Sequence, residues 1–278
     1  MKAEQLMANL RNISKQIEVS PQILLKIYMF DSLVERISIS RYKDNFVLKG
    51  GFYLSTLFGL ANRFTEDIDA MLQNAPFTEG NLNAMLQEIF AIDTGDGVLL
   101  RYRGIEPIRK EDKYGGFRVG VEGRLENIRD NFHIDIATGD EIIPHKLEYS
   151  YTPLLGRNDI SIYAYSLETV LAEKLETLFR RSISNGRMKD YYDIYLIYQA
   201  NKDKINIDLL KEAVKTVFAN RGLTVQHDRV LSLMEENGPM RIVWSNYSKK
   251  HPFAREIKFD DVFACIKNLC KEIGLTQG

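Results

Sequence analysis

Apolar and polar positions follow different periods in the two halves of the chain. Up to about residue 160, short segments with a period of two alternate with helical segments. Residues 3–38 are predicted to be helical, with Ser20 and Pro21 forming a helix-start signal. Further helices are predicted over 52–60 and 82–90. Strands are predicted over 46–49, 67–72, 98–102, 117–121 and 132–136.

From Ser166 onward the pattern is helical throughout. Helices are predicted over 167–181, 190–199, 207–219, 227–235, 239–249 and 260–273. An α+β first half is therefore followed by a mostly helical C-terminal lobe. We expect residues 1–160 to form the first lobe, with its N-terminal helices, and residues 161–278 to form the second.

Composition places the chain among globular proteins. Of its 278 residues, 45% are hydrophobic and 27% are charged, which is close to the average for such proteins. No apolar run approaches the roughly 20 residues that cross a membrane, so we expect a cytoplasmic protein without membrane contact. The net charge of −1 argues against a general nucleic-acid coat, although it leaves room for a local basic groove.

A Gly-Gly turn follows the first predicted strand. Lys49-Gly50-Gly51 joins the strand over 46–49 to the helix over 52–60. Glycines allow the backbone to approach phosphate oxygens, and the start of a helix offers N–H groups. The turn is therefore a candidate phosphate-binding element. A tight turn without any ligand explains the same pattern.

The next strand carries polar residues on one side. Arg63, Thr65, Asp67 and Asp69 fall at every second position, so their side chains share one face of an extended chain. Two carboxylates this close repel each other, and a divalent cation removes that cost. Mg²⁺ prefers such oxygen ligands and usually bridges them to substrate phosphates. The alternative is a solvated polar face on an edge strand.

Asp135 supplies a third carboxylate. It lies between Ile134 and Ile136 in an apolar strand, where a charge needs a partner. If this strand pairs beside the one that carries Asp67 and Asp69, three carboxylates converge. Such a site suits phosphoryl or nucleotidyl transfer assisted by Mg²⁺ or Mn²⁺. An isolated aspartate at a strand end is the alternative.

The helical lobe contains a lysine within an apolar stripe. Lys174 falls near the middle of the face formed by residues such as Leu171 and Leu175. Burial of an unpaired ammonium is costly, so the side chain either extends to solvent along its stem or finds a partner. The second interpretation places Lys174 in the cleft between the lobes, where it meets a triphosphate or a carboxylate.

Two aspartates begin the following helix. Asp190 and Asp193 are three residues apart and lie on one side of it. Acidic residues in a first turn often only complement the helix dipole. Here a basic stretch that includes Arg181 and Arg187 precedes them, and this favours an ion-paired rim for a substrate.

Taken in order, these segments resemble the AbiEii/AbiGii toxin family of nucleotidyltransferases, whose relatives include the MenT toxins. The resemblance rests on Lys49-Gly50-Gly51 with Leu54, the segment Arg63 to Asp69, His133 to Ile136, Ala172 to Leu175, and Arg187 to Tyr195. It implies a DNA-polymerase-β-like nucleotidyltransferase core with a helical partner lobe. It also implies Mg²⁺-dependent transfer of a nucleotide from a nucleoside triphosphate (NTP). In characterised members the acceptor is the 3′ end of tRNA, its extension blocks translation, and an adjacent antitoxin restrains the toxin.

The resemblance also assigns roles by position. It makes Asp67 and Asp69 metal ligands, Thr65 the preceding hydroxyl, Lys174 the triphosphate-binding lysine, and Asp190 the aspartate of the last motif. Gly50-Gly51 replaces the Gly-Ser of the wider superfamily, and Lys189-Asp190 replaces an Arg-Asp pair, which weakens a bidentate phosphate contact.

The expected site is the sum of both lines of reasoning. The expected catalytic residues are Asp67, Asp69, Asp135, Lys174 and Asp190, and the expected metal ligands are Asp67, Asp69 and Asp135. The expected nucleotide-binding residues are Lys49, Gly50, Gly51, Arg63, Thr65, Lys174, Arg181 and Asp193. Two alternatives stay open: a nucleotidyltransferase acting on a small molecule or a protein hydroxyl, and a non-catalytic protein that binds nucleotide and a partner.

Overall fold

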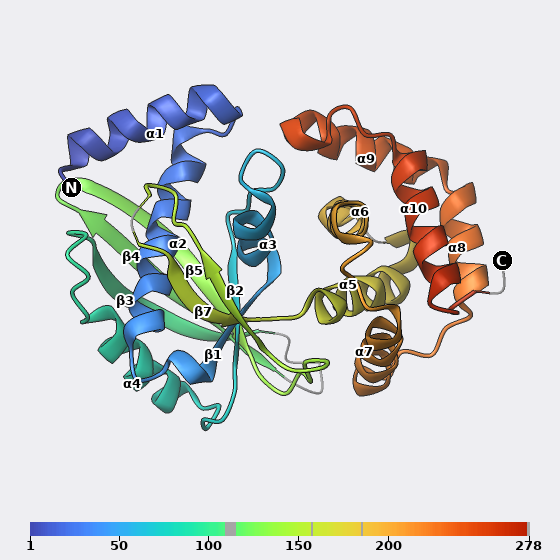
Figure 1. Ribbon diagram of the computed structural model, residues 1–278, viewed down its shortest axis with the longest axis horizontal. Coiled ribbons are helices and arrows are strands. Elements are labelled where there is room, and N and C mark those ends of the chain that lie inside the picture. Colours follow the sequence, from blue (N-terminus) through green and yellow to red (C-terminus); the bar gives the residue numbers. More distant parts are fainter. Residues whose placement is uncertain (109–114, 157, 185, 277–278) are drawn as a thin grey trace. The chain divides into compact units, whose positions relative to one another are not determined.

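A computed structural model describes residues 1–108, 115–156, 158–184 and 186–276 (Figure 1). The chain forms two compact units. The first consists of Met1–Asp140 and Lys146–Tyr165, and the second of Glu141–His145 and Ser166–Gly278. A short segment before the second unit thus packs with the helices that follow it. Each unit has its own core and is described separately.

The first unit is built on a seven-stranded mixed sheet with the order β3-β4-β5-β2-β1-β7-β6 (Figure 1). The strands are β1 Phe46–Lys49, β2 Ile68–Leu72, β3 Leu99–Ile108, β4 Gly116–Leu125, β5 Ile128–Ala137, β6 Leu147–Tyr151 and β7 Ile160–Ala164. Two neighbouring pairs are parallel, β2 with β5 and β1 with β7, and the others are antiparallel. The predicted β hairpins over 98–136 are confirmed as β3, β4 and β5, each longer than expected.

Helix α2, Pro21–Ile39, covers one face of this sheet. Along β5, Phe132 and Ile134 are buried whereas His133 is exposed, so alternate residues face opposite sides. The Phe30 ring of α2 meets the Phe132 ring edge to face at 5.2 Å. The buried set of β5 therefore faces α2, and the side chains that alternate with it belong to the other, more open face.

The predicted helix over 3–38 is in fact two helices. Helix α1, Ala3–Ile17, ends where Glu18 adopts a left-handed conformation with φ 55°. Helix α2 then begins at Pro21, with the Ser20 side chain accepting a hydrogen bond from the Ile23 N–H. The start signal at Ser20 was predicted correctly, and the break before it was not. The other helices of this unit are α3 Gly50–Phe58 and α4 Glu79–Phe90.

Strands β6 and β7 were not predicted. In β7, Ile160, Ile162 and Ala164 are buried and alternate with more exposed residues. In β6 only Tyr151 is buried, as is typical of an edge strand. Strand β7 pairs in parallel with β1 and so extends the sheet beyond the Gly-Gly turn.

The second unit is helical, as predicted. Its helices are α5 Leu167–Arg181, α6 Met188–Asn201, α7 Ile207–Asn220, α8 His227–Glu236, α9 Gly238–Lys250 and α10 Phe259–Glu272. Ser166 caps α5 by accepting the Thr169 N–H, and its hydroxyl donates to the Ile143 carbonyl oxygen. This second bond ties the segment Glu141–His145 to the start of α5.

No helix in the described ranges is both long and apolar enough to span a membrane.

Candidate active site

Strand pairing brings four ionisable residues into one row across the first unit. Lys49 of β1 is opposite Asp69 of β2, Asp69 is opposite Asp135 of β5, and Asp135 is opposite Arg118 of β4. Residues in register on neighbouring strands point to the same face of a sheet. The sequence analysis required the strand of Asp135 to pair beside the strand of Asp69, and β5 does pair with β2. Asp69 and Asp135 therefore share one face of the sheet.

The Gly-Gly turn lies directly against this row. Gly50 has φ +69°, and a Cβ built on it would lie 2.2 Å from Asp69 Oδ2. A Cβ on Gly51 would lie 2.8 Å from Thr65 Oγ1. Only glycine satisfies both the backbone conformation and the close approach at position 50. The turn therefore seats the Asp69 carboxylate against the first turn of α3.

Thr65 organises the segment that leads into β2. Its hydroxyl oxygen accepts the Asp67 N–H at 3.1 Å. Thr65 is buried, whereas Asp67 is exposed and Asp69 is half-buried. The Arg63 side chain is also buried and donates to the Phe64 carbonyl oxygen. The buried side chains of Arg63 and Thr65 thus support the turn, whereas Asp67 and Asp69 lie closer to the surface.

Asp135 forms a bidentate ion pair with Arg118. The Arg118 Nε–Asp135 Oδ1 and Nη2–Oδ2 distances are both 2.8 Å. These hydrogen bonds raise the pKa of the Arg118 guanidinium above its ordinary value, and the charges of Asp135 and Asp67 contribute. The sequence did not identify Arg118, because its partner lies 17 residues away on another strand.

Lys49 is buried and has partners within the first unit. Its ammonium donates to Asp140 Oδ2 at 2.9 Å and to the Tyr165 hydroxyl at 3.1 Å. The same ammonium lies 4.6 Å from the centre of the Tyr165 ring. These contacts give the Lys49 charge a structural explanation. Its predicted contact with nucleotide stays a prediction.

Across the described residues, no group of three or more His, Cys, Asp or Glu side chains has the spacing of a metal site. Both oxygens of Asp135 accept hydrogen bonds from Arg118. The assignment of Asp67, Asp69 and Asp135 as metal ligands therefore stays a prediction. In this arrangement Asp67 and Asp69 are the stronger candidates, because a substrate-bridged Mg²⁺ needs only one or two protein carboxylates.

The second unit contains a half-buried lysine between two buried aspartates. Lys174 Nζ lies 2.7 Å from Asp190 Oδ1 and 2.7 Å from Asp193 Oδ2. Arg187 Nε lies 3.1 Å from the other oxygen of Asp190. Burial alone would lower the pKa of Lys174, but the two carboxylates raise it above its ordinary value. Lys174 is therefore a charged group held in place, and it meets carboxylates, one of the two expected partners.

A second ion-pair network joins α5 to Arg221, which follows α7. The fully buried Glu176 is 3.0 Å from Arg221 Nη1, and Arg180 Nη2 lies 2.5 Å from the other Glu176 oxygen. Arg221 also pairs with Glu173 at 2.8 Å. Arg181, predicted to bind nucleotide, is exposed at the C-terminal end of α5. Both arginines are thus exposed, but Arg180 pairs with the buried Glu176.

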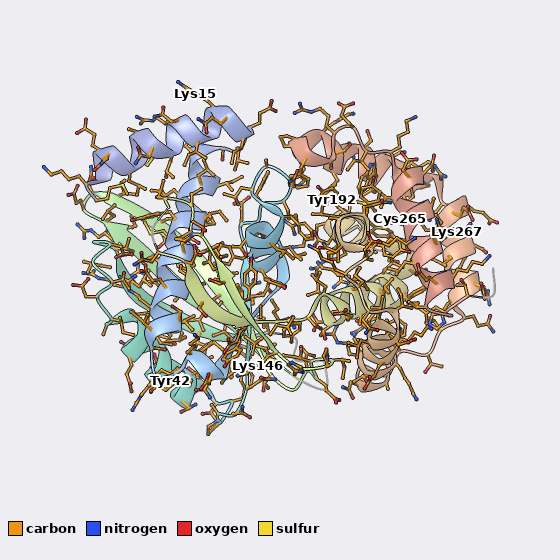
Figure 2. All side chains as sticks on the ribbon, in the orientation of Figure 1. Lys15, Tyr42, Lys146, Tyr192, Cys265 and Lys267 are labelled. Carbon is orange, nitrogen blue, oxygen red and sulfur yellow. The ribbon has the colours of Figure 1, made fainter. Side chains whose placement is uncertain are left out.

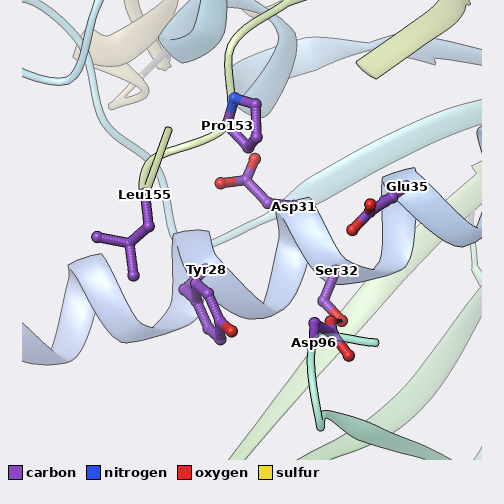
Figure 3. Close-up of a pocket in the computed structure, with 7 residues that line it drawn as sticks. All are labelled: Tyr28, Asp31, Ser32, Glu35, Asp96, Pro153 and Leu155. Carbon is purple, nitrogen blue, oxygen red and sulfur yellow. Dashed lines mark hydrogen bonds between the residues drawn. The ribbon is translucent and has the colours of Figure 1, made fainter. Parts of the chain in front are cut away.

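A further set of acidic residues, Asp31, Glu35 and Asp96, lies on α2 and beside it. The Asp31 carboxylate accepts from the Tyr151 hydroxyl at 3.0 Å and from the Leu154 N–H at 2.9 Å. Burial raises the pKa of Asp31 to about 7. Figure 3 shows this carboxylate directed toward Pro153. The pocket around it is lined by Tyr28, Asp31, Ser32, Glu35, Asp96, Pro153 and Leu155 (Figure 3).

The fold is similar to that of solved structures. A candidate nucleotidyltransferase from Helicobacter pylori is similar with a TM-score of 0.50 at 16% identity, covering 92% of this chain and 98% of the other. The Helicobacter pylori protein JHP933 is similar with a TM-score of 0.50 at 17% identity, covering 92% and 95%. The chain thus has the fold of nucleotidyltransferase-like structures. No curated protein gives a significant match.

The family follows from the sequence match. Residues 32–265 match the family described as nucleotidyl transferase AbiEii toxin, type IV toxin–antitoxin system. The match covers most of the chain, which therefore belongs to the AbiEii family. Membership makes the chain an NTP-dependent nucleotidyltransferase of the type IV toxin class. The matched residues include the Gly-Gly turn, the row of the sheet and the Lys174 cluster.

Proposed function

We propose that this chain is a Mg²⁺-dependent toxin that transfers a nucleotide from an NTP to RNA, at the 3′ end of tRNA, and so blocks translation. The fold would then be a DNA-polymerase-β-like nucleotidyltransferase core. The observation that carries the proposal is the seating of the Asp69 carboxylate against Gly50, beside the exposed Asp67 and at the first turn of α3. The carboxylates lie beside the N-terminus of a helix. This combination suits a triphosphate with a bound cation, because carboxylates hold the cation and helix N–H groups hold phosphate oxygens.

In this proposal Asp67 and Asp69 hold the divalent cation. Their hard oxygen atoms suit Mg²⁺ or Mn²⁺, and the close approach at Gly50 leaves the Asp69 side chain little freedom. The cation, when bound, neutralises phosphate charge and stabilises the pyrophosphate leaving group. Thr65 sets the backbone direction at Asp67 through its hydroxyl. Lys49 and Arg63 support the nucleotide site indirectly, by stabilising the Gly-Gly turn.

Asp135 is proposed to accept the proton of the attacking hydroxyl. An ionised carboxylate has about four acceptor positions, and Arg118 occupies two of them. The bidentate ion pair fixes the orientation of the carboxylate. Asp135 can then accept a hydrogen bond from an acceptor hydroxyl while Arg118 positions it.

In the second unit, Lys174 is proposed to contact the triphosphate. An ammonium has three N–H donors, and the contacts with Asp190 and Asp193 use two. The third is available to a phosphate oxygen. Asp190 and Asp193 keep the lysine charged and directed, and the exposed Arg181 would add to the positive rim. Membership of a toxin–antitoxin family further supports a cognate antitoxin as partner.

A transfer assay tests the proposal. The purified chain is incubated with each α-labelled NTP, Mg²⁺ and total RNA, and the products are separated on a denaturing gel. Label in tRNA that disappears in Asp69→Asn is the expected result. Label in protein or in a small molecule would replace the RNA acceptor by another, and equal labelling by Asp69→Asn would remove the proposed role of Asp69.

A further inference from the structure

The face of β3, β4 and β5 that lies opposite α2 is rich in arginine. Register and exposure place five arginines on it: Arg101, Arg103, Arg118, Arg124 and Arg129. Three carboxylates share the face: Glu106, Glu122 and Asp135. This surface, here called the arginine face, thus carries two net positive charges on a chain whose net charge is −1. This face of the sheet therefore carries a local excess of positive charge.

A β-bulge shapes this face. Tyr102 is opposite Val121 and Gly104 is opposite Gly120, so Arg103 is the extra residue of β3. A Cβ on Gly120 would lie 3.4 Å from Arg103 Cβ, and this places the Arg103 side chain over the open face of β4. A larger residue at position 120 would crowd Arg103. The strand geometry thus directs an additional arginine to the side that carries Asp135.

Two cations of this face, Arg103 and Arg129, are available to an anion. Arg103 Nη2 and Arg129 Nε lie 3.5 and 3.7 Å from Glu122 Oε2, and the two arginine side chains are 58% and 57% exposed. These distances exceed the roughly 2.7–2.9 Å of a charge-assisted hydrogen bond. Glu122, itself buried, therefore stabilises both charges from beneath without occupying their hydrogen-bonding groups closely.

We propose that the arginine face binds the sugar-phosphate backbone of the acceptor RNA. This inference rests on the proposed function and adds the surface along which the acceptor lies. Exposed guanidinium groups recognise phosphates by charge and by their planar donors. The face is continuous with the row of the sheet, because Arg118 of β4 pairs with Asp135. An RNA strand held on β3–β5 therefore leads to the carboxylates that would receive its terminal hydroxyl.

The test compares two triple variants of the full chain. The face variant is Arg101→Gln/Arg103→Gln/Arg129→Gln, which leaves Arg118 and all proposed catalytic residues intact. The control variant removes the same charge from exposed cations of α1 and of the segment after α2: Arg11→Gln/Lys15→Gln/Arg41→Gln. Lys15 extends outward from α1 (Figure 2), and α1 packs on α2, which covers the opposite face of the sheet.

The probe is a fluorescein-labelled RNA hairpin with a single-stranded 3′ end, titrated at several salt concentrations. The loss of three phosphate contacts should reduce the magnitude of the negative slope of log K against log salt by about 2–3. It should also weaken RNA binding at least about tenfold. The control variant should bind like the wild type. Affinity for a non-hydrolysable NTP should be unchanged in both variants. Far-UV circular dichroism and the thermal midpoint verify that both variants fold.

Two results would overturn the inference: unchanged RNA binding by the face variant, or equal weakening by both variants. If RNA binding is unchanged and the face variant instead fails to bind a purified antitoxin, the face belongs to a protein partner. Failure of the proposed function gives a different result, since the wild type would then transfer no label to any RNA. Transfer by the wild type combined with unchanged RNA binding by the face variant rejects only this inference.

Discussion

Replacing Gly50 by alanine tests the close approach on which the candidate active site depends. Any L residue at φ +69° has a backbone penalty of about 1–2 kcal/mol. At this position the new Cβ would also lie 2.2 Å from Asp69 Oδ2, so the carboxylate has to move by roughly 1 Å or more. Such overpacking adds about 1–3 kcal/mol. We therefore expect Gly50→Ala to lower the free energy of unfolding by about 2–5 kcal/mol.

Gly95 provides a matched control. It has the same φ of +69°, and a Cβ built on it has nothing within 4 Å. Gly95→Ala should therefore show only the backbone penalty of about 1–2 kcal/mol. Urea unfolding at pH 7 measures the free energy of unfolding for both variants. The difference between the two losses in free energy of unfolding gives the cost of the steric overlap with Asp69.

The same pair separates activity from stability. A displacement of about 1 Å in a reacting group can reduce a rate roughly 100-fold. In the labelled-NTP assay, at a temperature where both variants are folded, Gly50→Ala should lose about 100-fold of the transfer rate. Gly95→Ala should stay within about threefold of the wild type. Equal transfer rates for the two alanine variants would refute the reasoning, because the position of Asp69 would then be irrelevant to the reaction.

Three further predictions concern single ionisable residues. Lys174→Met leaves two buried aspartates without their shared cation. The free energy of unfolding, measured by urea titration at pH 7, should therefore fall by about 3–5 kcal/mol; a loss below about 1 kcal/mol contradicts this. Arg118→Lys removes the bidentate contact with Asp135, so the transfer rate should fall at least about tenfold. Because the site is partly exposed, the free energy of unfolding should change by less than about 1 kcal/mol. An unchanged transfer rate would show that Arg118 does not position Asp135. Asp31 has a raised pKa, so its protonated form stabilises the fold below about pH 4, and this contribution is lost as the pH rises through about 7. Relative to Asp31→Asn, the free energy of unfolding of the wild type should fall by about 4 kcal/mol between pH 4 and pH 8, since one pKa unit is worth about 1.36 kcal/mol. Asp159→Asn, at an exposed position, serves as the control. Parallel pH profiles for Asp31→Asn and the wild type would contradict the raised pKa of Asp31.

The helices of the second unit could be predicted because their signals are local. Helix α5 occupies the expected 167–181, since Ser166 is a cap and the apolar positions of the helix recur with its period. The break after α1 was missed, because Glu18 takes a left-handed conformation that glycine or asparagine usually signals. Strand β6 was missed because most of it is exposed at the edge of the sheet. Whether such a segment forms a strand depends on burial by elements distant in sequence. The local pattern of apolar residues contains no information about that burial.

The candidate site was predictable where its residues share a segment. Thr65, Asp67 and Asp69 lie on one short stretch, so alternation alone placed them together. The apolar surroundings of Lys174 predicted a partner for its charge, and a carboxylate was one of the two partners expected. Arg118 was not predictable in this way, because its role depends on the register between β4 and β5. Register is a tertiary property, and the sequence near Arg118 contains no sign of Asp135.

The account depends most on Asp67 and Asp69 as a cation site that forms with bound nucleotide. Electron paramagnetic resonance measures Mn²⁺ binding directly, in the presence of a non-hydrolysable NTP, for the wild type and for Asp67→Asn/Asp69→Asn. The account predicts that the wild type binds Mn²⁺ with nucleotide present and that the double variant binds it at least about 100-fold more weakly, while its thermal midpoint shows that it remains folded. Equal Mn²⁺ affinity in the two proteins would contradict the account.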